Sequence, residues 1–251
     1  AVPARWYGWN GRYSLPLGMI NDFFMADGSK ARPLDEWFEN KEFSTEAANG
    51  TIANTFHMFV NREPRFYANI HFPNQRVSYA YPNEEDSYQD EDGYGIVDFW
   101  YKGVSGNGST PGDKNTTGFS VRKNIPLNYC SNKEKAKDTW NLNVPFPIIR
   151  LGEVYLNYAE ARAELNSLTQ ADLDKTINRL RDRVGMKHLS MKVANQNIDP
   201  YLDNKATGYI GVTGENKGVI LEIRRERSIE LLQENFRTSD ILRSRRPSGL
   251  R

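Results

Sequence analysis

The chain contains 251 residues, and its 33 lysines and arginines against 32 aspartates and glutamates give a formal net charge of +1. With 38% hydrophobic and 26% charged residues, the composition excludes a disordered charged tail, a collagen-like repeat and a low-complexity polymer. The near-neutral charge gives no reason to expect a nucleic-acid partner, and the single cysteine, Cys130, excludes an internal disulfide, a multi-cysteine zinc site and an iron–sulfur cluster.

Residues 1–146 are rich in glycine, asparagine and aromatic side chains and poor in helical periodicity. We therefore expect long loops with short strands in this half. Residues 17–24 predict a short amphipathic helix that ends at an Asp27-Gly28 turn, and residues 68–72 predict a strand.

The pattern becomes helical after residue 147. Residues 150–165 predict a helix whose apolar face would consist of Leu151, Val154, Tyr155, Tyr158, Ala159, Arg162 and Leu165. Thr169 and Asp172 are spaced as in a capping box, so a second helix should begin there and end near Gly185. A third helix is expected over residues 217–235, after an irregular excursion over residues 186–214.

Catalytic machinery is hard to find in the sequence. The three histidines are far apart, and none forms a metal-binding or hydrolase motif. The acidic run over residues 84–92 would offer oxygen ligands to calcium, but it lacks the order of a helix–loop–helix site, so we favour a solvated loop. We expect neither an enzyme nor a bound cofactor.

Aromatic residues on loops are the strongest functional signal, since aromatic residues make up 12% of the chain. A tryptophan or tyrosine ring can stack on the apolar face of a sugar, while amide, carboxylate and guanidinium groups bind its hydroxyls. Two groups of such residues lie around positions 6–13 and 79–101. Packing inside the fold is the alternative for each single ring.

Six stretches resemble the SusD/RagB family and occur in that family's order. They are Phe24 to Gly28 (FMADG), Asn61 to Tyr67 (NREPRFY), Phe146 to Ala161 (FPIIRLGEVYLNYAEA), Ile177 to Gly185 (INRLRDRVG), Ile223 to Leu231 (IRRERSIEL) and Glu234 to Arg243 (ENFRTSDILR). Together they are spread over nearly the whole chain, from residue 24 to residue 243. Arg227, Glu230, Glu234 and Arg237 recur at helical spacing, and we expect them to pair with one another, with Asp240 as a further partner.

The resemblance implies a mainly α fold, in which a tetratricopeptide-type helical scaffold carries long loops and a few short strands. We expect residues 1–146 to form a loop-rich region that faces the ligand and residues 147–251 to form the scaffold. Family members are about twice as long and carry an N-terminal lipidated cysteine, so we expect this chain to be a fragment that lacks both ends.

The resemblance also implies a function without catalysis. The chain would capture oligosaccharides at the extracellular face of the outer membrane and deliver them to a TonB-dependent transporter of the SusC type. The protein would be attached to the membrane through a lipid anchor, which we expect to lie outside this chain. Capture of oligopeptides, as in the RagB branch, and a structural module without a ligand site of its own are the alternatives. The residues expected to bind the ligand are Arg5, Trp6, Tyr7, Trp9, Asn10, Tyr81, Asp98, Trp100 and Tyr101.

Overall fold

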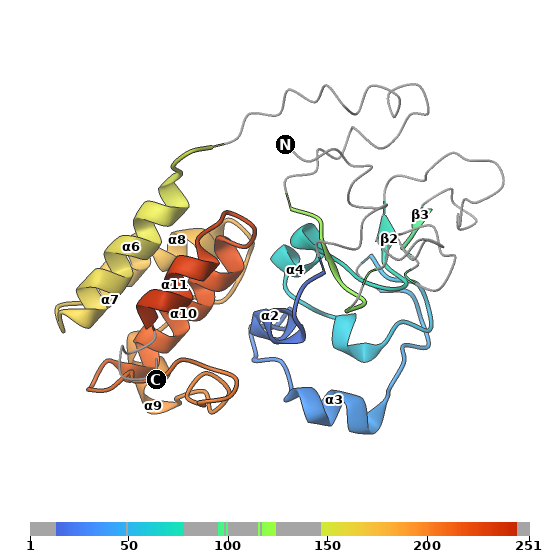
Figure 1. Ribbon diagram of the computed structural model, residues 1–251, viewed down its shortest axis with the longest axis horizontal. Coiled ribbons are helices and arrows are strands. Elements are labelled where there is room, and N and C mark those ends of the chain that lie inside the picture. Colours follow the sequence, from blue (N-terminus) through green and yellow to red (C-terminus); the bar gives the residue numbers. More distant parts are fainter. Residues whose placement is uncertain are drawn as a thin grey trace. The chain divides into compact units, whose positions relative to one another are not determined.

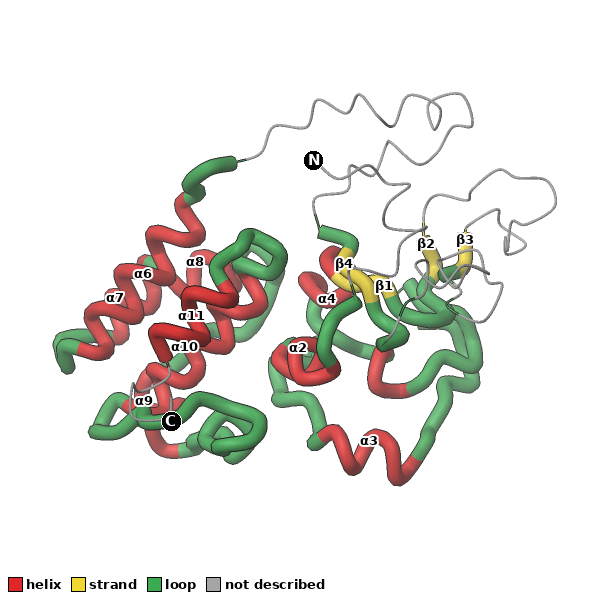
Figure 2. The backbone as a smooth tube through the Cα atoms, in the orientation of Figure 1, coloured by secondary structure: helices red, strands yellow, loops and turns green. Residues whose placement is uncertain are grey.

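The computed structural model describes residues 14–48, 50–77, 95–97, 99, 115, 117–123 and 147–244. This part of the chain is mainly helical, as predicted, and its strands are two residues long (Figure 2). The chain divides into two compact units (Figure 1). Unit 1 comprises residues 1–21 and 32–146, and unit 2 comprises residues 22–31 and 147–251.

Unit 1 combines short helices with two small antiparallel sheets. The helices are α3 (Leu34–Asn40), the 3-10 helix η2 (His57–Phe59) and α4 (Pro64–Asn69), together with α2 (Leu17–Asp22) up to residue 21. The sheets pair β1 (Ile70–His71) with β4 (Ser120–Val121), and β2 (Arg76–Val77) with β3 (Gly95–Ile96). In the first sheet Ile70 lies opposite Val121.

The helix predicted over residues 17–24 is confirmed, and α2 ends at residue 22. The strand predicted over residues 68–72 is shorter than expected, because Ala68 and Asn69 still belong to α4. Pro64 begins α4 with a backbone angle that suits a first helical turn. The helix therefore extends over residues that the sequence pattern alone favoured as a strand.

The core of unit 1 is built from phenylalanine rings. The ring of Phe59 stacks on that of Phe72 with centroids 4.9 Å apart and meets Phe119 edge-on at 5.5 Å. Phe66 lies 5.4 Å from Phe72, and its side chain is fully buried. Offset and edge-on arrangements of this kind are the favourable ones for aromatic pairs, so they fix the geometry of a small core.

Arg62 is buried in this core, and its contacts explain part of the NREPRFY stretch. Its guanidinium donates hydrogen bonds to the carbonyls of Met58 (3.0 Å) and Ile20 (2.7 Å) and lies over the ring of Phe66, 4.8 Å from the centroid. Burial lowers the pKa of Arg62 to about 10. The guanidinium therefore remains charged at neutral pH and holds together backbone segments far apart in the sequence.

The buried His71 makes the stability of unit 1 dependent on pH. Its Nδ1 lies 2.8 Å from Oε1 of Gln75, and burial lowers its pKa to about 4. In the unfolded chain the pKa of the imidazole is near 6.5. Between about pH 4 and 6.5 the unfolded state therefore binds more protons than the folded state. We expect stability to fall by up to about 3 kcal/mol as the pH drops from 6.5 to 4.

Urea denaturation at pH 7, 6, 5 and 4 measures this effect. The variant His71→Asn should show a flatter pH dependence than the unchanged chain. His188→Asn is the comparison variant, because it removes an imidazole that is 57% exposed instead of one that is buried. Parallel profiles for His71→Asn and the unchanged chain would show that burial of the imidazole has no such effect.

Unit 2 consists of helices joined by turns. They are α6 (Leu151–Glu164), α7 (Gln170–Lys175), α8 (Ile177–Asp182), α9 (Met191–Gln196), α10 (Lys217–Glu230) and α11 (Arg237–Ser244). The predicted helix over residues 150–165 is confirmed as α6, and the one over 217–235 is confirmed as α10, which ends earlier. The excursion over residues 186–214 is irregular apart from α9.

The predicted capping box is present at the start of α7. The side chain of Thr169 accepts a hydrogen bond from the backbone N–H of Asp172, and Asp172 accepts one from the backbone N–H of Thr169. Gly185 has a φ of 67°, as expected for a helix end. The second helix is interrupted at Thr176, whose φ of −124° and ψ of −89° separate α7 from α8.

The apolar face predicted for α6 is only partly buried. Ala159 is buried and Tyr155 packs against the apolar cluster, but Leu151, Val154 and Leu165 are 61%, 48% and 75% exposed. The helix also buries Gly152, Leu156, Glu160 and Ala163, which the prediction did not include. Three of the buried residues, Gly152, Ala159 and Ala163, are small, and small side chains allow α10 to pack closely against α6. The larger apolar residues Leu151 and Val154 lie on another face of the helix.

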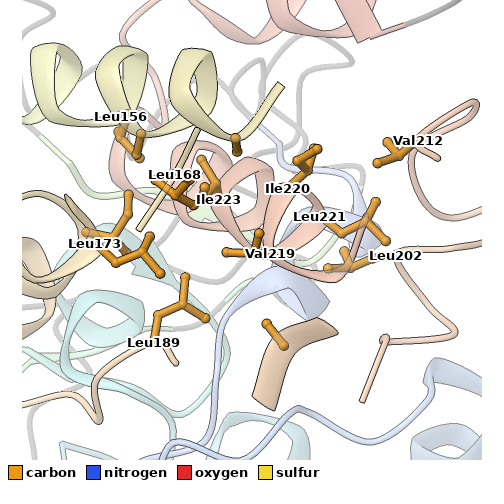
Figure 3. Packing of buried hydrophobic residues seen from close by; sticks show 14 of the residues in the cluster. Leu156, Leu168, Leu173, Leu189, Leu202, Val212, Val219, Ile220, Leu221 and Ile223 are labelled. Carbon is orange, nitrogen blue, oxygen red and sulfur yellow. The ribbon is translucent and has the colours of Figure 1, made fainter. Parts of the chain in front are cut away.

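Helix α10 is the centre of unit 2 and is buried almost all round. Val219, Leu221 and Ile223 join one apolar cluster with residues of α6, α7 and the excursion that includes α9 (Figure 3). At Gly218 a Cβ atom would lie 2.0 Å from the carbonyl oxygen of Ala194 in α9. The two helices therefore meet backbone to backbone, and only glycine fits at this point.

Residues 22–31 lie apart from the rest of unit 2 in the sequence. The ring of Phe24 contacts the guanidinium groups of both Arg181 and Arg225, each 5.0 Å from its centroid. Asp22 accepts a hydrogen bond of 2.6 Å from the hydroxyl of Ser228. We call residues 22–31 the docked segment, because its contacts with α8 and α10 make it part of the core.

Candidate binding surfaces

The predicted ligand-binding residues all lie outside the described residues, and so do Cys130 and the acidic run over residues 84–92. Their assignment therefore stays a prediction. They are Arg5, Trp6, Tyr7, Trp9, Asn10, Tyr81, Asp98, Trp100 and Tyr101. The described residues contribute an internal charge network and two apolar surfaces.

The charged residues at the end of α10 pair differently from the prediction. Arg227 does bind Asp240, with its Nε 2.8 and 2.9 Å from the two carboxylate oxygens. Glu230 and Glu234, however, bind Arg150, at 2.8 and 2.7 Å. Positive φ angles at Gln233 and Asn235 turn the chain after α10, so residues at helical spacing in the sequence no longer share one helix face.

The sequence pattern missed Arg150, which precedes α6 and lies far from α10 along the chain. Burial lowers the pKa of Arg150, but hydrogen bonds to Glu234 and Glu230 outweigh burial and raise it overall. Arg183 adds a second cation 2.9 Å from Glu230. These charges neutralise one another, which suits a scaffold better than a reactive centre.

A second pair inside unit 2 has the same character. Nε and a terminal nitrogen of Arg181 both lie 2.9 Å from one carboxylate oxygen of Glu226, and both side chains are buried. Within the described ranges no group of three or more metal-ligating side chains comes together. None of the described helices is long and apolar enough to cross a membrane.

An exposed group of phenylalanine rings in unit 1 forms the first apolar surface. Phe38 and Phe43 are 46% and 52% exposed, and both contact Phe56, with centroids 5.9 and 5.5 Å from its ring. Phe56 in turn meets Phe59 of the core at 5.9 Å. We call Phe38, Phe43 and Phe56 the aromatic surface.

Backbone pairing gives the aromatic surface a defined frame. Phe43 and Phe56 are antiparallel bridge partners, and the N–H of His57 donates to the carbonyl of Glu42 at 2.9 Å. The N–H of Ser44 donates to the carbonyl of Thr55 at 2.8 Å. Phe38 comes from α3, where the neighbouring Trp37 is buried.

Charged side chains border the aromatic surface. Arg32 lies 3.8 Å from Glu36 and 3.6 Å from Glu42, and its guanidinium is 4.9 Å from the centroid of the Trp37 ring. Nδ1 of His57 is 3.2 Å from the same Glu42 carboxylate. These four side chains are all partly exposed, so a bound molecule could reach them.

The sequence reasoning passed over these phenylalanines because it followed tryptophan and tyrosine on glycine-rich loops. A signal was nevertheless present in α3, where Trp37 and Phe38 are adjacent. Successive residues of a helix point about 100° apart, so a short helix with a narrow buried face can bury one of the two rings and leave the other outside it. Burial of Trp37 leaves Phe38 on the surface.

The second apolar surface belongs to α6 and the residues before it. We call it the α6 face, and its members are Ile148, Ile149, Leu151, Val154, Tyr158 and Leu165. Ile148, Leu165 and Ile149 are the most exposed, at 88%, 75% and 73%. Their exposure is unusual for aliphatic side chains, and contiguous apolar surface of this kind is typical of contact regions.

A family model and the name of one solved protein indicate the same family. A family model described as the SusD family matches residues 2–248. Among solved structures, a SusD-like protein from Bacteroides fragilis is 26% identical with a TM-score of 0.53, and the match covers 92% of this chain and 35% of that protein. No curated protein matches the sequence.

Two further structures, of a protein named BT4246 and its selenomethionine form, are each 22% identical to this chain. Their TM-scores are 0.59 and 0.60, and each match covers 91% of this chain. At this identity the likeness supports the fold alone. The chain spans about a third of the length of these solved proteins, with 35% or 34% of each covered.

Proposed function

Since the chain belongs to the SusD family, we propose that it is part of a nutrient-binding surface protein that captures oligosaccharides. The family match over residues 2–248 is the observation that carries this proposal. The likeness to a SusD-like protein from Bacteroides fragilis supports it. Binding, rather than catalysis, is the role that this family membership favours.

The protein would work at the extracellular face of the outer membrane. A lipid anchor would hold it there, and it would pass its ligand to a TonB-dependent transporter of the SusC type. Unit 2 would act as the rigid support, because its ion pairs and apolar cluster fix the helices to one another. Binding residues on loops are commonly held by such a scaffold.

The ligand would be held by the two groups of aromatic residues predicted from the sequence. Trp6, Tyr7 and Trp9 would form one group, with Arg5 and Asn10 binding hydroxyls. Tyr81, Trp100 and Tyr101 would form the other, with Asp98. Stacking supplies apolar contact, and the polar groups orient the sugar.

Replacing Trp6 and Trp9 with alanine should weaken binding of an oligosaccharide at least 10-fold. Each lost ring gives up buried apolar area at roughly 25 cal/mol per Å², so two rings together lose more than the roughly 1.4 kcal/mol that corresponds to a factor of ten in affinity. Isothermal titration of the full-length protein with a glycan panel measures the loss. Trp140→Ala is the matched control, since it removes a tryptophan outside the predicted set.

Two results would contradict this function. No binding to any glycan by the full-length protein would remove its basis. Peptides found by mass spectrometry in the purified protein would instead favour capture of oligopeptides. Unchanged glycan binding by the double variant would show that Trp6 and Trp9 are not the site, while leaving the function itself in place.

A further inference from the structure

We propose that the aromatic surface of unit 1 binds a polypeptide segment that carries lysine or arginine next to apolar side chains. This interaction is separate from oligosaccharide capture and involves none of the residues assigned to the sugar. It follows from three properties of residues 32–57: exposed rings, unpaired carboxylates and a rigid frame.

The first property is exposed apolar area in one place. Phe38 and Phe43 are about half exposed, and both touch Phe56, so the three rings form a continuous patch. Burial of an aromatic ring against a partner removes apolar area from water. Phenylalanine lacks the N–H or O–H group with which tryptophan and tyrosine bind sugar hydroxyls, so these rings suit apolar side chains better than a saccharide.

The second property is negative charge around the rings. Residues 32–57 contain five carboxylates and two cationic side chains, a formal charge of −3 in a chain whose total is +1. Glu36 and Glu42 share Arg32. Within the described ranges the exposed residues Asp35, Glu39 and Glu46 form no ion pair and remain available to a cationic partner.

The charge and the rings favour the same partner. A lysine or arginine side chain can lie over the face of a phenylalanine ring while its charged end reaches a carboxylate. An acidic border also repels acidic segments, so it selects among apolar partners. A neutral sugar can donate hydroxyl hydrogen bonds to these carboxylates, but it carries no positive charge to pair with them, so the net negative charge favours a cationic partner.

The third property is rigidity. Backbone hydrogen bonds between residues 42–44 and 55–57 hold Phe43 opposite Phe56. The N–H of Asn54 donates to the carbonyl of Ser44 at 2.7 Å and joins the two ends of the loop between these sides. A partner would therefore meet a surface that is already ordered, which lowers the entropic cost of binding.

A synthetic peptide of alternating leucine and lysine, labelled with fluorescein, is the probe. Its binding to the full chain is followed by fluorescence anisotropy. We expect Phe38→Ser combined with Phe43→Ser to weaken binding at least 10-fold. Val193→Ser combined with Ile210→Ser is the matched control, because it removes two apolar side chains that are 55% and 44% exposed in unit 2. This control should bind as the unchanged chain does.

The charge is tested separately. Replacing Asp35, Glu39 and Glu46 with their amides should weaken binding of the leucine–lysine peptide and reduce its dependence on salt. A peptide of alternating leucine and glutamate should bind at least 10-fold more weakly than the lysine peptide. Circular dichroism and the urea midpoint of each variant check that the chain remains folded. We expect it to, because the substituted positions are exposed.

Three results would overturn the proposal. They are undiminished binding by the double phenylalanine variant, equal binding of the leucine–glutamate peptide, and displacement of the probe by maltoheptaose. The last result would identify the surface as a sugar site. Loss of glycan binding in the Trp6 and Trp9 variant has no bearing on these outcomes, so the two proposals can fail independently.

Discussion

Replacing Gly218 with alanine should lower the free energy of unfolding of unit 2 by about 4 kcal/mol, near the upper end for a single substitution. The new Cβ atom would lie 2.0 Å from the carbonyl oxygen of Ala194 and 2.8 Å from the Cα atom of Asn195. Both are backbone atoms, so no side-chain rotation can relieve the overlap. Helix α9 would have to separate from α10, which exposes part of the apolar cluster.

Urea denaturation of the variant and the unchanged chain measures this loss. Gly185→Ala is the matched control, since Gly185 has a φ of 67° but no atom within 4 Å of a new Cβ. It should lose only about 1 kcal/mol, from the cost of a left-handed backbone angle. Equal losses for the two variants would show that the close contact with α9 has no special cost.

Replacing Phe24 with alanine should destabilise unit 2 by about 3–5 kcal/mol, the usual cost of deleting a buried phenylalanine. The side chain is 4% exposed and contacts both Arg181 and Arg225. Its removal would leave a cavity and take away the ring that both guanidinium groups contact. Phe24→Leu should cost less, because leucine fills more of the cavity.

Thermal and urea unfolding followed by circular dichroism measure the effect. Phe38→Ala is the matched control, because it deletes the same side chain from a position that is 46% exposed. It should change the free energy of unfolding by less than about 1 kcal/mol, as is usual for a surface position. Similar losses for the two variants would mean that Phe24 contributes little to the packing of unit 2.

The helices of unit 2 could be predicted because their signals are local. The periodicity of residues 150–165 indicates α6, and the spacing of Thr169 and Asp172 indicates the start of α7. A capping box involves residues three positions apart, so the sequence contains all of it. The break at Thr176 could not be predicted in this way, since residues 170–182 read as one continuous helix.

The direction of each helix face was harder to predict, because it depends on partners from elsewhere in the chain. The larger apolar residues of α6 suggest one buried face, whereas α10 packs against another that carries Gly152, Ala159 and Ala163. Arg150 shows the same limit. Its partners, Glu230 and Glu234, are some 80 residues away in the sequence, and no spacing rule connects them.

The candidate surfaces were predictable only in part. Aromatic residues were identified as the functional signal, and the described part of unit 1 does expose aromatic rings, but they are phenylalanines that were not selected. Whether a ring becomes core or surface depends on its neighbours. Phe66 and Phe38 are the same residue type, and only the packing around them makes one fully buried and the other half exposed.

The docked segment also affects how the chain can be divided into fragments. A fragment that begins at residue 147 would contain every helix from α6 to α11 but would lack Phe24 and Asp22. Its two arginines, Arg181 and Arg225, would then face water where a ring had been. An expression fragment of unit 2 therefore needs residues 22–31, either joined through a linker or added as a separate peptide to restore the fold.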